Sequence, residues 1–255
     1  MPYLDSHAHL DFPEYDADRD EVLRRAREGG VGMIFNVGTD PVRSARSLEL
    51  ARTVEGIYGV GGWHPHSAAE VTPEGMLKLE ELLTHPKMIA VGEVGLDFYR
   101  DPAPRETQIE VFRLCFRMAA RLAKPLVIHC RDAYSVLEEV LREEGAPPYR
   151  GIMHCFSSER EVMTQFLDMG FHISFSGALT YKKNDALREA CKACPKDRIF
   201  METDAPFLAP QPFRGKRNEP VYVLETYSVA AGLLGMPREA LGEQTLANAK
   251  KLFSL

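Results

Sequence analysis

The sequence lacks the features of a secreted or membrane protein. No apolar run approaches the ~18 residues that a membrane-spanning helix needs. Residues 1–5 contain neither the basic segment nor the apolar segment of a signal peptide. The five cysteines are an odd number and are widely spaced, unlike the paired cysteines of a disulfide-stabilised secreted domain. We therefore expect a soluble protein of the reducing cytoplasm, with no membrane partner.

The chain also has no excess of positive charge. Lysine and arginine total 31 against 37 aspartate and glutamate residues, which gives a net charge of −6. This balance argues against a broad basic surface that would hold duplex DNA non-specifically. It leaves room for a small basic pocket, because a bound metal ion supplies positive charge that the residue count omits.

Short apolar runs alternate with longer amphipathic segments from one end of the chain to the other. Eight of the runs are predicted strands, at residues 3–6, 33–37, 57–61, 88–91, 125–128, 151–153, 171–175 and 198–201. The predicted helices between them include residues 19–28, 104–122, 133–144 and 159–169. In residues 104–122, apolar side chains recur at three- and four-residue steps, as one buried helix face requires.

Strands that alternate with helices pair in parallel, and eight such units are typical of a closed (β/α)₈ barrel. A doubly wound open sheet is the alternative, but no Gly-x-Gly-x-x-Gly motif follows the first predicted strand. The chain has 255 residues, and no linker or low-complexity segment interrupts the pattern. We therefore predict an α/β fold, a single TIM barrel domain over residues 1–255.

A potential metal ligand lies at the C-terminal end of five of these predicted strands. The set is His7, His9, Glu93, His129, His154 and Asp204. Barrel enzymes carry their active sites at this end, and alternate residues of an extended chain face the same side. Imidazole and carboxylate ligands suit Zn²⁺ or Mn²⁺, and Mg²⁺ remains open. The set exceeds the needs of one catalytic zinc but matches a two-metal site with one bridging carboxylate.

Other histidines and cysteines have simpler interpretations. His172 follows a phenylalanine in a predicted strand and is interpreted as a buried core residue, and His85 as a residue at a helix end. Cys130 and Cys155 each follow a proposed ligand, so alternation should turn both away from the barrel axis and into packing contacts.

These residues, in this order, resemble the TatD family of metal-dependent deoxyribonucleases, among the amidohydrolase-like barrel hydrolases. The matching segments are residues 5–11 (Asp-Ser-His-Ala-His-Leu-Asp), 62–66 (Gly-Trp-His-Pro-His), 92–97, 128–133, 154–156, 202–206 and 214–220. Each segment alone is weak, but their ordered combination is specific and covers nearly the whole chain.

The resemblance implies a site with two divalent metal ions. His7, His9 and Asp204 would bind one ion. His129 and His154 would bind the other, and Glu93 would bridge both. The implied activity is hydrolysis of phosphodiester bonds in DNA, often as a 3′-to-5′ exonuclease on single strands.

Catalytic and substrate-binding roles follow from this assignment. Asp204 is expected to accept the proton of the attacking water while it holds its metal. Glu202 has the same strand parity as Asp204 and is expected to complete the catalytic set with Glu93 by orienting a ligand or a water. The predicted substrate-binding residues, which would contact single-stranded DNA, are His64, Lys182, Arg214, Lys216 and Arg217.

Two other functions stay open at this point. A related barrel site can hydrolyse an ester or amide, such as the aminoacyl ester of a charged tRNA, because an activated water also attacks carbonyl carbon. A non-catalytic metal-binding protein is the second alternative. No long apolar surface stripe is evident in the sequence, so we expect a monomer.

Overall fold

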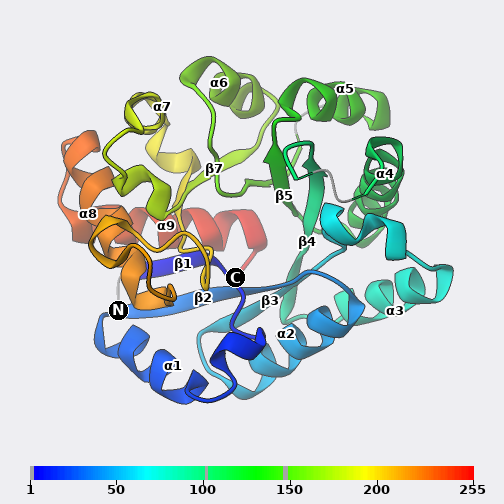
Figure 1. The fold of residues 1–255 in the computed structure, drawn as a ribbon, viewed down its shortest axis with the longest axis horizontal. Coiled ribbons are helices and arrows are strands. Elements are labelled where there is room, and N and C mark those ends of the chain that lie inside the picture. The colour runs from blue at the N-terminus through cyan, green and yellow to red at the C-terminus, as the bar shows by residue number, and fades with distance from the viewer. Residues whose placement is uncertain (1–2, 101–102, 146–148) are drawn as a thin grey trace.

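The computed structural model describes residues 3–100, 103–145 and 149–255, and these form a (β/α)₈ barrel (Figure 1). Its eight strands are parallel, and each pairs with the next in sequence order. They are Tyr3–Ala8 (β1), Val31–Gly38 (β2), Ile57–Gly61 (β3), Met88–Asp97 (β4), Leu126–Arg131 (β5), Gly151–Met153 (β6), His172–Phe175 (β7) and Ile199–Met201 (β8). The predicted fold class is confirmed.

Helices surround the strands in Figure 1. They are Arg19–Glu28 (α1), Pro41–Thr53 (α2), Pro73–Leu83 (α3), Arg105–Leu122 (α4), Tyr134–Glu144 (α5), Arg160–Asp168 (α6), Asp185–Ala193 (α7), Val223–Leu234 (α8) and Arg238–Phe253 (α9). Their starts have local causes: the Asp40 carboxylate caps α2, and the Thr72 hydroxyl caps α3. No helix among the described residues is long and apolar enough to cross a membrane.

The last strand is joined to the first by hydrogen bonds just beyond β8. The Asp204 N–H donates to the carbonyl of His7 at 2.9 Å, and the His9 N–H donates to the carbonyl of Ala205 at 2.8 Å. The buried Asp5 carboxylate also accepts from the backbone N–H of Thr203 at 2.9 Å and from its hydroxyl at 2.6 Å. These contacts place the ends of β1 and β8 side by side at one rim of the barrel.

Apolar side chains from the strands pack with the C-terminal helix in one core cluster. Its members are Leu4, Phe35, Val37, Val60, Ile89, Ala90, Val127, Ile152 and Phe200, with Ala249, Leu252 and Phe253 of α9. A larger cluster packs the strands against the surrounding helices. Helix α9 lies behind the strands in Figure 1 and contacts β1 and β8. Its packing leaves the opposite end of the barrel for the site.

Strand β4 runs further than its apolar run predicts, ending at Asp97 rather than at Val91. Strands β1 and β5 are likewise longer than predicted. The extension of β4 requires Gly95, which has a φ of +144° and where a Cβ would lie 1.9 Å from the carbonyl oxygen of His129. Backbone groups make the ladder whatever the side-chain polarity, so a count of apolar residues ends these strands too early.

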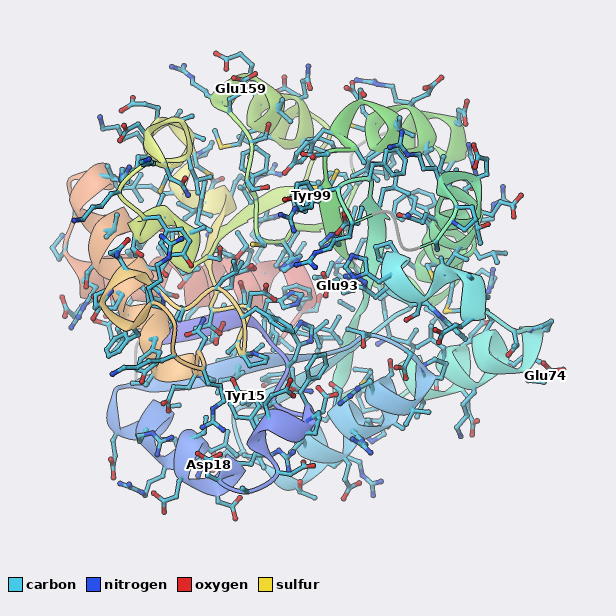
Figure 2. All side chains as sticks on the ribbon, in the orientation of Figure 1. Tyr15, Asp18, Glu74, Glu93, Tyr99 and Glu159 are labelled. Atoms are coloured by element: carbon cyan, nitrogen blue, oxygen red, sulfur yellow. The ribbon has the colours of Figure 1, made fainter. Side chains whose placement is uncertain are left out.

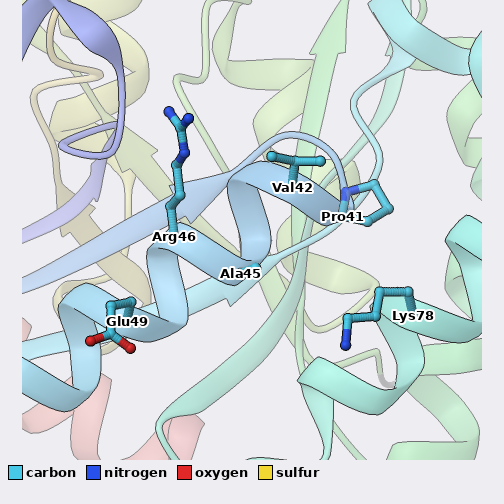
Figure 3. A pocket seen from close by; sticks show the side chains of 6 residues that line it. All are labelled: Pro41, Val42, Ala45, Arg46, Glu49 and Lys78. Carbon is cyan, nitrogen blue, oxygen red and sulfur yellow. The ribbon is translucent and has the colours of Figure 1, made fainter.

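A hollow of about 460 Å³ lies on the outer surface between α2 and α3 (Figure 3). Its lining residues are Pro41, Val42, Ala45, Arg46, Glu49 and Lys78. This lining offers one carboxylate and no histidine or cysteine, so it contains no metal-binding set. The chemistry-bearing residues gather instead at the C-terminal ends of the strands.

Candidate metal centre

The six predicted metal ligands converge on one cavity of about 1080 Å³ at the C-terminal ends of the strands. His7 lies within β1 and His9 just after it, Glu93 within β4, His129 within β5, and His154 and Asp204 follow β6 and β8. All of them line the cavity except His7, which is fully buried. Figure 2 shows Glu93 near the barrel axis.

The first group of donor atoms gathers around His7 and His9. Their Nε2 atoms are 3.3 Å apart. Asp204 Oδ1 lies 3.8 Å from the His7 nitrogen and 3.4 Å from the His9 nitrogen. Glu93 Oε2 lies 3.4 Å and 3.7 Å from the same two atoms. Each of the two imidazole nitrogens therefore has one oxygen of Asp204 and one oxygen of Glu93 within 3.8 Å.

The second group gathers around the other oxygen of Glu93. Its Oε1 lies 2.9 Å from His129 Nδ1 and 3.0 Å from His154 Nε2. The Nε2 atom of His64 is 3.3 Å from the same oxygen. Glu93 therefore presents one carboxylate oxygen to each group, which is the arrangement of a bridging ligand.

The chemistry and spacing of these donors fit divalent cations. Metal–nitrogen bonds of about 2.0–2.1 Å place two ligands of a tetrahedral ion about 3.3–3.4 Å apart. The Nε2 atoms of His7 and His9 have this separation, at 3.3 Å. Two imidazole nitrogens that face each other can share at most one proton, which leaves a nitrogen lone pair for a metal ion to accept. The absence of thiolates from the set favours Zn²⁺ or Mn²⁺ chemistry over softer ions.

Three of the histidines are oriented by an acceptor on their other ring nitrogen. Glu202 Oε1 accepts from His154 Nδ1 at 2.9 Å, and Asp97 Oδ2 lies 3.1 Å from His129 Nε2. The carbonyl of Val37 lies 2.7 Å from His9 Nδ1. Such outer acceptors fix the tautomer and angle of a ligating imidazole.

Glu202 is placed behind His154 rather than in the cavity wall. Its side chain is fully buried, and it is absent from the residues that line the cavity. From the sequence, Glu202 was predicted to belong to the catalytic set as an orienting group. Its position allows it to orient His154, and contact with a substrate would require His154 to move aside.

The charges of the surrounding histidines keep both carboxylates of the centre acidic. Burial would raise the pKa of Asp204, but the hydrogen bond with His9 and the charge of His154 hold it below its usual value. Burial opposes ionisation of Glu93 too, but the charge of His154 and the hydrogen bond with His129 more than offset it and lower its pKa. Burial lowers the pKa of His64 itself to about 4, so this imidazole is neutral at pH 7.

Of the five predicted substrate-binding residues, only His64 lines the cavity. Arg217 makes two contacts with the Asp18 carboxylate, at 2.8 and 2.6 Å, and its guanidinium lies 4.7 Å from the ring centre of Tyr15. Figure 2 shows Tyr15 and Asp18 well away from Glu93. Arg214 lies over Tyr181, and Lys182 and Lys216 are exposed outside the cavity lining.

The cations that do line the cavity are Arg100 and Arg131, which the sequence analysis did not select. Arg131 could have been found, since it has the same strand parity as His129 in β5. Arg100 follows the end of β4 in a loop, where no periodicity applies. Asp97 was also missed as a functional side chain: besides His129, it contacts His66 Nε2 at 2.7 Å.

Both cysteines that follow ligands border the cavity. Cys130 is buried within β5 and packs in the larger core cluster, as expected of a packing residue. Cys155 lines the cavity, and its sulfur lies 3.2 Å from the Ser176 hydroxyl. Strand β6 has already ended at Met153, and Cys155 has a φ of +44°, so the alternation of an extended chain no longer applies there. The expectation that Cys155 turns away from the site was wrong.

Comparison with known proteins gives the family. The profile described as TatD related DNase matches residues 4–254. The uncharacterized metal-dependent hydrolase YabD of Bacillus subtilis is 42% identical over 99% of both chains. The 3′-5′ ssDNA/RNA exonuclease TatD of Erwinia billingiae is 36% identical, again over 99% of each. The crystal structure of the TatD homologue YJJV from Escherichia coli superposes with a TM-score of 0.93 at 29% identity, covering 100% of this chain and 98% of that one. The chain therefore belongs to the TatD family of metal-dependent hydrolases.

Proposed function

We propose that this protein is a nuclease that removes nucleotides from the 3′ end of single-stranded nucleic acid, using two divalent cations. The observation that carries the proposal is that the two carboxylate oxygens of Glu93 face different donor groups. Its Oε2 faces His7 and His9, and its Oε1 faces His129 and His154. One carboxylate shared by two donor groups supports a pair of ions rather than one.

The residues around the cavity have complementary roles in such a hydrolysis. Divalent ions, when bound, lower the pKa of water and offset charge on phosphoryl oxygens. Asp204 lines the cavity and is held ionised by its histidine neighbours, so it can accept a proton from the attacking water. His64 accepts the N–H of His66 on its Nδ1, which leaves its proton on Nε2. Its Nε2 lies 3.3 Å from Glu93 Oε1, and a phosphate oxygen that enters the cavity beside Glu93 can accept the same proton.

Several features favour a phosphodiester over other substrates. Arg100 and Arg131 are cavity-lining cations that suit phosphate oxygens. The volume of about 1080 Å³ accommodates a nucleotide. The net charge of −6 favours local contact with a strand end over coverage of a long duplex. The relative from Erwinia billingiae, similar over its whole length, is named for an exonuclease on single-stranded DNA and RNA.

The test uses metal-stripped protein with Mn²⁺, Mg²⁺ or Zn²⁺ added back, and end-labelled single-stranded DNA and RNA. Stepwise shortening from the 3′ end is expected only with metal, and Glu93→Ala should abolish it. The matched control is Glu74→Ala, an exposed carboxylate on α3 that is labelled in Figure 2. Metal bound by the wild type without cleavage of any strand would reject the nuclease. Carboxyl ester and amide substrates, including an aminoacyl ester on tRNA, would then be assayed.

We further propose that the protein acts as a cytoplasmic monomer formed by this one barrel. The cavity is built from β1, β4, β5, β6 and β8 of a single chain and needs no second copy to complete its donor groups. Light scattering of the metal-loaded protein should give one chain per particle, and a stable dimer would contradict this.

A further inference from the structure

The rim of the cavity carries an unusual share of the exposed aromatic surface. Among the described residues, Tyr99 and Phe207 are the exposed aromatic side chains, at 61% and 48%, and both line the cavity. Leu208, at 37%, lies beside Phe207 in the same wall. Exposed apolar groups gathered at a pocket mark a binding surface more often than isolated ones do.

We infer that Tyr99 and Arg131 form a nucleobase-stacking platform that holds the base next to the phosphate in the metal centre. This inference rests on the proposed function and deepens it, because it makes a base, and not only a phosphate, part of what is recognised. The occupant is an unpaired base at the end of a single strand, whose flat faces are accessible as they are not within a duplex.

The first support is the geometry of the pair. The guanidinium carbon of Arg131 lies 3.8 Å from the centre of the Tyr99 ring. Arg131 therefore covers one face of the ring, while 61% of the side chain stays exposed. Among the described residues no carboxylate forms an ion pair with Arg131, so its charge is available to a backbone phosphate. A stacked base and a bound phosphate are the two parts of one nucleotide.

The second support is the connection between the platform and the metal centre. Asp97 Oδ1 accepts the backbone N–H groups of Tyr99 at 3.1 Å and of Arg100 at 2.8 Å. The other oxygen of the same carboxylate lies 3.1 Å from His129 Nε2. One buried side chain thus fixes the turn that carries Tyr99 and orients a predicted metal ligand. The Asp97 carboxylate therefore ties the backbone of Tyr99 directly to a candidate metal ligand.

The opposite wall of the cavity is also aromatic. Phe12 stacks on the His9 ring with centroids 4.7 Å apart, and Phe207 lies edge-on to Phe12 at 6.0 Å. Arg43 lies over Phe12 at 4.3 Å. These rings pack against one another and against a predicted ligand, so they form a firm apolar boundary. Tyr99 is more exposed than these rings, so it is the aromatic surface on which a base can stack.

The test measures binding to the Mn²⁺-loaded protein by fluorescence anisotropy. One labelled probe is a short oligothymidylate with phosphorothioate linkages, which resist turnover. The other has the same backbone with abasic tetrahydrofuran units in place of thymidine. The wild type is expected to bind the base-containing probe more tightly. Tyr99→Ala should weaken that binding by about 5- to 100-fold, the worth of one stacked base, and leave abasic binding unchanged.

Further variants separate stacking from charge. Tyr99→Phe keeps the ring and should bind as the wild type does. Arg131→Ala should weaken both probes and reduce the salt dependence of binding, because it removes a phosphate contact. The matched controls, Val42→Ala and Arg46→Ala, truncate exposed side chains in the outer hollow of Figure 3 and should change neither probe.

The outcomes distinguish this inference from the proposed function. No base preference in the wild type, or an equal loss of both probes in Tyr99→Ala, would overturn the platform. Base-selective binding without cleavage of an unmodified strand would keep the platform and overturn the nuclease. Normal cleavage of an unmodified strand together with equal binding of both probes would keep the nuclease and overturn the platform.

Discussion

Glu202 accepts a hydrogen bond from His154 at 2.9 Å on the side of the imidazole that faces away from the cavity. The Nε2 atom of the same ring lies 3.0 Å from Glu93 Oε1. This carboxylate–imidazole–carboxylate chain means that a change at Glu202 reaches the metal centre without any contact to substrate. In this series of contacts, Glu93 and His154 lie at the proposed reacting centre, and Glu202 positions His154 from behind.

Glu202→Gln should lower metal affinity rather than remove the cavity. An amide accepts more weakly than a carboxylate and can present its N–H₂ group instead, so His154 loses its fixed tautomer. We expect metal affinity to fall by about 10- to 100-fold, as is typical of such outer acceptors. Chelator competition measures the affinity. Glu144→Gln, a carboxylate 5% exposed and bound to Arg113 far from the centre, is the control. Unchanged affinity in Glu202→Gln would remove the positioning role.

Asp204→Asn tests the proposed base. Asparagine keeps an oxygen that can contact a metal but cannot accept the proton, so kcat should fall by about 10²- to 10⁴-fold. Metal content, measured by atomic emission, is expected to stay near that of the wild type. Asp185→Asn, whose carboxylate is 89% exposed at the start of α7, should keep full activity. Full turnover in Asp204→Asn with metals bound would exclude it as the base.

Removal of metal should destabilise the fold as well as abolish activity. The donor groups around Glu93 are buried and pack imidazole nitrogens against one another, as at His7 and His9. Metal at about 100 times its Kd contributes roughly 2.7 kcal/mol to the free energy of unfolding, which raises Tm by roughly 5–10 °C in a chain of this size. Differential scanning fluorimetry with and without chelator measures the shift. His7→Asn should reduce it, and an undiminished shift in that variant would place the stabilising ion elsewhere.

We expect His172 to lower the free energy of unfolding in acid, independently of the metal centre. Burial, and then the nearby charge of Arg198, lowers the pKa of this imidazole to about 4. Below pH 6.5 the unfolded chain takes up a proton that the folded chain refuses until about pH 4, so the free energy of unfolding falls across that range. The loss is at most about 3 kcal/mol.

Urea unfolding of chelator-treated wild type and of His172→Gln, at about pH 7.5 and 4.5, isolates this effect. Glutamine does not titrate, so the variant should lose less stability on acidification than the wild type does. Parallel losses in the two proteins would show that His172 does not contribute. The wild type is expected to keep its full share of this stabilisation above pH 6.5, where both states are neutral.

The extent of the strands shows where sequence patterns were informative and where they were not. All eight predicted strands were found, because buried parallel strands need apolar runs that loops and amphipathic helices do not contain. The end of β4 was predicted too early, because the residues that line a barrel mouth are polar although their backbone still forms the ladder. Helix ends were predicted within a residue where a proline or acidic residue precedes the first turn, as at Pro104 and Glu159.

The sequence by itself determined the candidate metal ligands that the fold brings together. Histidines and carboxylates at the ends of buried strands have few other reasons to be there, and parallel strands bring their C-terminal ends together. Only the tertiary structure decided which arginines line the cavity. In the folded protein, Arg217 pairs with the Asp18 carboxylate, and Arg131 lies over the Tyr99 ring at the rim of the cavity. Arginine and lysine in loops carry no periodic signal, so the path of the folded chain, and not the local sequence, sets where their charges lie.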